Sequence, residues 1–209
     1  MGRHDFSFDG GNSRVALATG LYAATPVQTA LGWLPAASLR VGDLVMTRDD
    51  GLMPITGVQT EHRAALWSVR VPQDAVGTHA EILLPPGQPV LIRSSFALPF
   101  SGDDLGLVSA TALEGWRGIA PQVPASAEPI LQLRLPRPSV LFVGPGMMVG
   151  CGGSEDNCFD LKQLLHCPSR PVLPLAAARQ MIAALVAQEA CTCLKQFYAA
   201  DLRDPPNRS

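Results

Sequence analysis

The sequence predicts an all-β domain followed by a C-terminal α-helical extension. Between residues 15 and 150, short runs of Val, Leu, Ile and Thr recur about every eight to fifteen residues, separated by turn residues. Glycine (19) and proline (19) together exceed their usual share, which favours many turns and short strands. After about residue 170 the chain becomes alanine-rich, and its apolar residues fall at helical intervals.

The composition limits the classes of function. Of the 209 residues, 47% are apolar and 16% charged, so a substantial core can form. A net charge of −2 leaves no basic surface of the kind that binds nucleic acid, and no nucleic-acid partner is expected. The sequence contains no P-loop, dinucleotide fingerprint, GxSxG or HExxH motif, and we expect no cofactor.

The N-terminal residues 1–14, MGRHDFSFDGGNSR, are polar and predict a flexible arm. Residues 15–39 carry no charge, but threonine, proline, glutamine and glycine interrupt them too often for a membrane span. Because Asp5 and Asp9 precede this run, it is no clear signal peptide either, and the cytoplasm is the default compartment. We expect buried strands and turns here.

Residues 15–150 are expected to form one β domain. Proline beside several of the apolar runs indicates strand edges, bulges or strand entries. The runs that predict strands are TPVQT, ALGW, DLVMT, LWSVRV, EILL, PVLIRSS, PILQLRL and SVLFV.

Residues 151–209 form a separate extension in this prediction. CGGSEDNC has the composition of a loop, and FDLKQLLH could make two helical turns. A long helix is predicted from residue 175 to about residue 202, and RDPPNRS follows its end. Its apolar stripe either packs against the β domain or binds a partner protein; its members are Leu175, Met181, Ile182, Leu185, Val186, Leu194 and Phe197.

Residues 24–55, ATPVQTALGWLPAASLRVGDLVMTRDDGLMPI, fit without gaps the pattern GTxVxTxxGWxPVExLxxGDxVxTxDxGxxPI. This run resembles the opening of bacterial Hint domains, the fold shared by Hedgehog autoprocessing domains and inteins. The resemblance implies a horseshoe of short, bent strands in two pseudo-symmetric halves. It makes Thr25, Gly42 and Asp43 scaffold positions, with a structural hydrogen bond at Asp43 rather than a catalytic role.

Two later segments extend the resemblance, which covers residues 20 to 150 and fades towards the end. SVRVPQDAVGTHAEILLPPGQPVLI, residues 68–92, is similar to the strands that carry a Ser/Thr–Pro–x–His element in the family. LGLVSATALEGWRGI, residues 105–119, and PILQLRLPRPSVLFVGPGMMV are similar to its later strands.

The chemistry of the family identifies the residues that matter. Hint domains begin self-cleavage when a cysteine thiol attacks the preceding peptide carbonyl, which gives a reactive thioester. The resemblance places that cysteine five positions before Thr25, at Gly20, which has no nucleophile. The Ser/Thr and His that polarise the scissile amide fall at Pro85 and Gln88, and glutamine is no general acid near pH 7. In the family a further histidine is expected on a later strand, and the resemblance places it near Pro138 in this sequence.

These losses predict a Hint-domain protein without self-cleavage, which acts as a non-catalytic scaffold or interaction module. A protein partner could bind through the C-terminal helix. Two alternatives stay open. One is an autoprocessing enzyme with a shifted nucleophile, and the other is a metal or redox module built on the C-terminal cysteines.

The cysteines all lie after residue 150. Together with His166 they suggest zinc ligands, but paired CxxC motifs are missing. Two of them, separated by one residue in a helix, would point to different faces. Free thiols, one or two disulfides and a metal site remain the alternatives, and we expect no metal; the cysteines are Cys151, Cys158, Cys167, Cys191 and Cys193.

Overall fold

The computed structural model describes residues 17–61, 67–102, 104–123, 128–152 and 171–201. Within these ranges it contains fourteen short strands and one long C-terminal helix, so the predicted all-β class with a helical extension is confirmed. The expected arm at residues 1–14, the FDLKQLLH segment, and the residues His166, Cys158 and Cys167 lie outside the described residues.

The largest sheet has the strand order β10-β9-β14-β13-β2-β4-β5, with β3 paired to β2. All its pairings between strands are antiparallel. Its strands are β2 (Pro26–Thr29), β3 (Gly32–Pro35), β4 (Leu44–Thr47), β5 (Gly51–Pro54), β9 (Pro89–Arg93), β10 (Leu105–Ser109), β13 (Ser139–Val143) and β14 (Met147–Cys151).

Two smaller antiparallel sheets complete the β domain. The first has the order β1-β12-β6 and consists of β1 (Leu21–Tyr22), β12 (Ile130–Arg134) and β6 (Gly57–Glu61). The second has the order β11-β7-β8 and consists of β11 (Ala120–Gln122), β7 (Ser68–Val71) and β8 (Ile82–Leu84). Strands distant in sequence are therefore neighbours, and the site described below depends on these long-range pairings.

The uncharged N-terminal stretch supplies strands and turns. Within its described part it forms β1, β2 and β3: both residues of β1 are buried, alternate residues of β2 enter the core, and β3 lies largely exposed, so burial was expected correctly for β1 and β2 but not for β3. Val27 is fully buried between two partly exposed neighbours. Among the described residues, no helix has the length and apolarity needed to cross a membrane.

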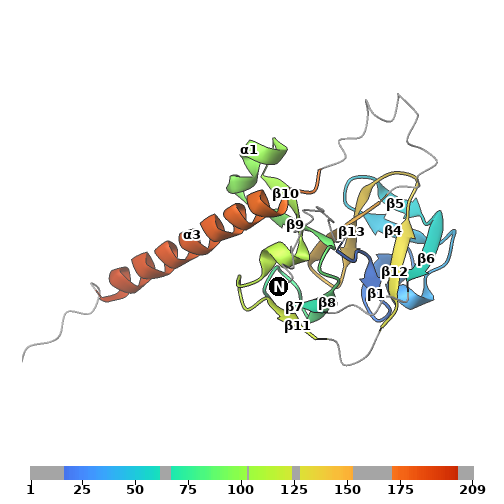
Figure 1. The fold of residues 1–209 in the computed structure, drawn as a ribbon, viewed down its shortest axis with the longest axis horizontal. Coiled ribbons are helices and arrows are strands. Elements are labelled where there is room, and N and C mark those ends of the chain that lie inside the picture. Colours follow the sequence, from blue (N-terminus) through green and yellow to red (C-terminus); the bar gives the residue numbers. More distant parts are fainter. Residues whose placement is uncertain (1–16, 62–66, 103, 124–127, 153–170, 202–209) are drawn as a thin grey trace, which may run out of the picture.

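The long helix α3 (Leu175–Asp201) begins against the β domain and then extends away from it (Figure 1). Its predicted apolar stripe is divided. Met181 and Ile182 are buried in the core, whereas Leu175 and Val186 are 38% and 42% exposed. Short helical turns lie elsewhere, at α1 (Leu98–Ser101) and in the 3-10 segments Ala36–Ser38, Ser95–Ala97 and Ala110–Leu113.

Candidate functional site

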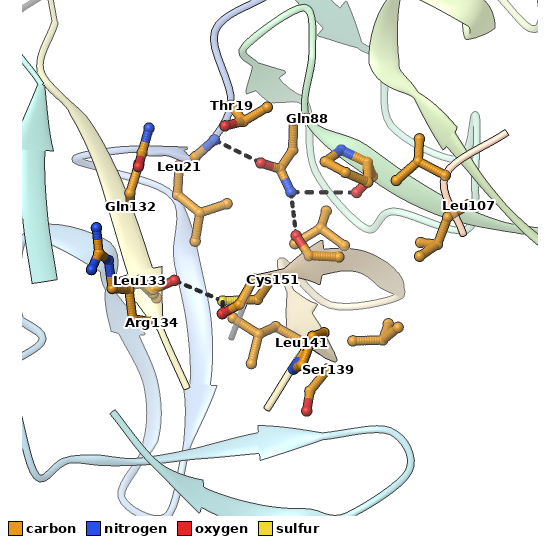
Figure 2. Close-up of a pocket in the computed structure, with 18 of the residues that line it drawn as sticks. Thr19, Leu21, Gln88, Leu107, Gln132, Leu133, Arg134, Ser139, Leu141 and Cys151 are labelled. Atoms are coloured by element: carbon orange, nitrogen blue, oxygen red, sulfur yellow. Dashed lines mark hydrogen bonds between the residues drawn. The ribbon is translucent and has the colours of Figure 1, made fainter. Parts of the chain in front are cut away.

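Gly20 and Gln88 lie in direct contact although 68 positions separate them in the sequence. The backbone N–H of Gly20 donates a hydrogen bond to Oε1 of Gln88, with an N···O distance of 2.7 Å (Figure 2). The Gln88 residue is only 3% exposed. The two positions at which the resemblance expects a nucleophile and a histidine therefore meet in one site.

The side-chain amide of Gln88 has a single consistent orientation. Its Nε2 donates to the carbonyl oxygen of Gly150 at 2.8 Å and to that of Pro89 at 3.3 Å. Because carbonyl oxygens only accept hydrogen bonds, the NH₂ group must face them, and Oε1 must face the Gly20 N–H. Gln88 thus accepts a hydrogen bond from the amide nitrogen of residue 20 and presents no donor to it.

The turn at residues 85–88 also holds the chain that precedes Gly20. The N–H of Gly87 donates to the carbonyl of Ala18 at 2.9 Å, and the N–H of Gln88 donates to the carbonyl of Pro85 at 3.0 Å. A Cβ atom at Gly87 would lie only 2.7 Å from the carbonyl oxygen of Leu17. Pro85 is buried and its side chain has no hydrogen-bonding group, so it cannot replace a serine or threonine hydroxyl.

Gly20 has no room for a side chain. Its φ is +124°, and a Cβ built there would lie 2.6 Å from both Cγ2 of Ile130 and the carbonyl oxygen of Leu131. Any larger residue would require the backbone of β12 to move, in addition to adopting a backbone conformation that favours glycine. The position lacks both the nucleophile and the space for one.

A cavity of about 390 Å³ opens beside Gly20 and Gln88. Its size falls in the range of small-molecule pockets. Aliphatic side chains are the largest group in its wall, beside the polar side chains of Thr19, Asp49, Gln88, Gln132, Arg134 and Ser139. Pro138, near which a third histidine was expected, also lines it. The aliphatic residues include Leu107, Leu131, Leu133, Val140, Leu141 and Val149.

Cys151 is part of this cavity, which the sequence did not predict. It ends β14 opposite Ser139 of β13 and lines the cavity beside Pro138. Its Sγ donates to the carbonyl of Leu133 at 3.0 Å, and burial raises the pKa of the thiol from 9.0 to about 12. The cysteine is therefore a protonated thiol at neutral pH. A hairpin assignment for SVLFVGPGMMVGC would have been the signal that located it.

The other described cysteines lie elsewhere. Cys191 and Cys193 are exposed on α3, and both are free. No cluster of three or more His, Cys, Asp or Glu suited to a metal ion occurs within the described ranges. The zinc and disulfide alternatives also involve Cys158 and Cys167, which fall outside those ranges, so they remain untested.

The scaffold positions Thr25, Gly42 and Asp43 make hydrogen bonds within the β domain and do not line the cavity. Asp43 Oδ2 accepts a hydrogen bond of 2.7 Å from the N–H of Arg40, and the N–H of Gly42 donates to the carbonyl of Ile55 at 2.8 Å. Thr25 is 5% exposed, and its carbonyl accepts a hydrogen bond from the N–H of Ala36. Gly42 and Asp43 therefore fix the entry of the chain into β4, and Thr25 connects the entry of β2 to the segment that follows β3.

Comparison with solved structures finds the same fold in intein-like proteins. The solution structure of the bacterial intein-like domain from Clostridium thermocellum aligns with a TM-score of 0.50 and 12% identity, over 63% of this chain and 98% of that one. The MchDnaB-1 intein (N145AA) aligns with a TM-score of 0.41 and 16% identity, over 65% and 100% of the two chains. The gp41-1 intein aligns with a TM-score of 0.42 and 15% identity, over 62% and 96%.

The family follows from the sequence model that matches the chain. The Hint domain model matches residues 19–146, more than half of the sequence, and the chain therefore belongs to the Hint domain family. Comparison with curated proteins finds no match. The matched range contains the Gly20–Gln88 contact, but Cys151 and α3 lie beyond it.

Proposed function

We propose that this Hint-domain protein does not cleave itself and serves as a non-catalytic scaffold or interaction module. The observation that carries the proposal is the Gly20–Gln88 contact, because it brings together the two positions where the resemblance expects the reactive groups. An acyl shift at the Thr19–Gly20 peptide bond needs a thiol or hydroxyl on residue 20, and Gly20 has neither that group nor the space for it.

The second support is the chemistry of Gln88. Expulsion of the amine requires proton donation to the nitrogen of residue 20. Gln88 turns its acceptor Oε1 towards that nitrogen and uses its Nε2 donors on Gly150 and Pro89. The bonds therefore stabilise the intact amide rather than its leaving group.

A shifted nucleophile is also disfavoured. Cys151 is the cysteine that lines the described cavity, and with its pKa raised to about 12 it carries almost no thiolate near pH 7. Tyr22 is 4% exposed and its hydroxyl lies 2.6 Å from Oγ of Ser68. Burial raises the pKa of Tyr22, although the Ser68 bond acts in the opposite direction, so its hydroxyl is also protonated.

The test uses the full chain behind an N-terminal reporter domain. After prolonged incubation with and without dithiothreitol or hydroxylamine, intact-mass spectrometry should find one uncut species. Release of the fragment 20–209, accelerated by either reagent, would contradict the proposal because a thioester reacts readily with both. Release that disappears in Cys151→Ser would instead identify a shifted nucleophile.

A matched pair of variants separates missing chemistry from missing space. The double variant Gly20→Cys, Gln88→His supplies both family groups, and Gln88→His alone supplies only the acid. We expect neither to cleave, because the single variant still has no nucleophile at residue 20, and in the double variant the Cβ at position 20 would collide with β12. Cleavage by the double variant would show that the site remains competent and that only the residues had changed.

A further inference from the structure

The cavity beside Gly20 and Gln88 has an apolar interior and a polar rim. The aliphatic side chains of its wall are at most 7% exposed; they are Leu107, Leu131, Leu133, Val140, Leu141 and Val149. The lining residues Thr19, Gln132 and Arg134 are partly or largely exposed, as is Asp49. Because accessible residues lie towards the opening, a ligand would meet polar groups at the rim and aliphatic groups inside.

The rim carries a positive charge that no carboxylate of the described residues neutralises. In the described part of the lining, the charged residues are Asp49 and Arg134. The carboxylate of Asp49 is paired with the guanidinium of Arg48. Within the described ranges Arg134 forms no ion pair, and its Nη2 donates to Oε1 of Gln59 at 3.2 Å. A guanidinium has five N–H donors in a fork that matches a carboxylate, so Arg134 can bind an anion at the rim.

The interior of the cavity suits an alkyl group. Cys151 lines it as a protonated thiol whose Sγ donates to the carbonyl of Leu133. The buried polar residues of the wall, Gln88 and Ser139, are hydrogen-bonded to the protein itself, and the Ser139 hydroxyl donates to the carbonyl of Arg137 at 3.2 Å. A ligand therefore needs no polar atom inside, and burial of its apolar surface against the aliphatic wall is favourable.

We propose that this cavity binds a small aliphatic carboxylate, with the carboxylate on Arg134 at the rim and the alkyl chain against the inner wall. A purely apolar ligand would leave the charge of Arg134 unpaired, and a small polar anion would leave the aliphatic wall facing water. The volume of about 390 Å³ is at the lower end of the range for small-molecule pockets, which favours a short alkyl chain. The inference rests on the proposed non-catalytic function, because it gives the same cleft a ligand in place of a reaction.

The first test is isothermal titration calorimetry of the full chain with sodium octanoate. For a ligand of this size a dissociation constant between about 10 µM and 1 mM is expected. Octanol has the same chain without the charge and should bind about tenfold more weakly, because it lacks the charge-assisted hydrogen bonds. Acetate has the carboxylate without the chain and should not bind at about 10 mM. Absence of octanoate binding at about 10 mM would overturn the proposal.

A pair of arginine variants tests the role of the rim. Arg134→Gln removes the charge and should raise the dissociation constant of octanoate about tenfold, while that of octanol stays unchanged. Arg93→Gln makes the same change outside the cavity, at a side chain that is 74% exposed, and should affect neither ligand. Circular dichroism checks that both variants are folded. Equal octanoate affinities in the two variants would contradict carboxylate binding by Arg134.

Cys151 reports whether the ligand lies in the cavity. Alkylation by iodoacetamide, followed by peptide mass mapping, compares its labelling rate with that of Cys191, which is exposed on α3. With octanoate at about ten times its dissociation constant, labelling of Cys151 should slow about tenfold and that of Cys191 should not change. An unchanged rate at Cys151 would rule out the cavity as the binding site. Intact-mass spectra of the same samples record self-cleavage separately, so failure of binding is distinguishable from failure of the proposed function.

Discussion

Two turns of the β domain match the Hint pattern to different degrees. The turn at residues 40–43 keeps the family pattern, and Asp43 makes a hydrogen bond that closes the turn. The turn at residues 85–88 has Pro85 and Gln88 where the resemblance expects Ser/Thr and His, and Gln88 accepts a hydrogen bond from the backbone N–H of Gly20. The contact between residues 20 and 88 is therefore present, although the residues at positions 20, 85 and 88 are glycine, proline and glutamine.

The two turns also differ in how much the fold depends on them. Asp43 is partly exposed, so water can replace a lost hydrogen bond there. Gln88 is buried and connects three separate chain segments, at Gly20, Pro89 and Gly150. The 85–88 turn is therefore a structural junction, and substitutions there should affect stability more than substitutions in the scaffold turn.

The largest effect on stability is expected from alanine substitutions at Gly20, which contacts Gln88, and at Gly42, in the scaffold turn. Gly20→Ala should lower the free energy of unfolding by about 3 kcal/mol or more, since its Cβ meets Ile130 and the β12 backbone. Gly42→Ala has a similarly positive φ of +96° but meets no atom within 4 Å, and about 1–2 kcal/mol is expected. Urea unfolding measures both. Equal losses would mean that crowding at Gly20 is unimportant.

The next largest effect on stability is expected from removing the side chains of Gln88 and Asp43. Gln88→Ala leaves the partly buried Gly20 N–H and two carbonyls without this partner and removes a buried side chain, so it should lower the free energy of unfolding by about 3 kcal/mol. Asp43→Ala removes one partly exposed turn bond and should lower it by about 1 kcal/mol. Chemical denaturation of both variants gives the comparison. A smaller loss at Gln88 than at Asp43 would refute the structural role of the 85–88 turn.

The smallest effect is a pH dependence from Cys151. Its pKa is raised in the folded state, so the unfolded chain loses this proton first as the pH rises. The stabilising contribution is complete below pH 9.0 and is lost between pH 9.0 and about 12. From about pH 9 to 10 the free energy of unfolding should fall by about 1 kcal/mol more in the unmodified chain than in Cys151→Ala. Parallel pH profiles of the two proteins would exclude this contribution.

Much of the fold could be predicted from local patterns. The runs TPVQT, DLVMT and PVLIRSS became β2, β4 and β9 because their alternating or continuous apolar residues match strand geometry. The alanine-rich C-terminal segment became α3. The division of its apolar stripe into buried and exposed parts could not be predicted, because it depends on how far the β domain reaches along the helix.

The site was predicted only in part. The resemblance selected Gly20, Pro85 and Gln88 as the positions of the family's reactive groups, and the structure brings Gly20 into contact with Gln88. Cys151 was not selected, since its place in the cavity depends on the β13–β14 register and on the neighbouring β12. Pairings between distant strands leave no signal in a single sequence.

By itself, the sequence determined which chemical groups the chain has: strand-forming runs, a helical segment with little charge, and no thiol or hydroxyl at residue 20. These are properties of individual residues and their near neighbours, so they can be read without a structure. The tertiary structure alone decided that Gly20 has no space for a side chain, that Gln88 accepts a hydrogen bond from the Gly20 N–H, and that Cys151 is a partly buried thiol with a raised pKa. Each of these depends on atoms contributed by distant segments, because packing and hydrogen-bond partners are set by long-range contacts.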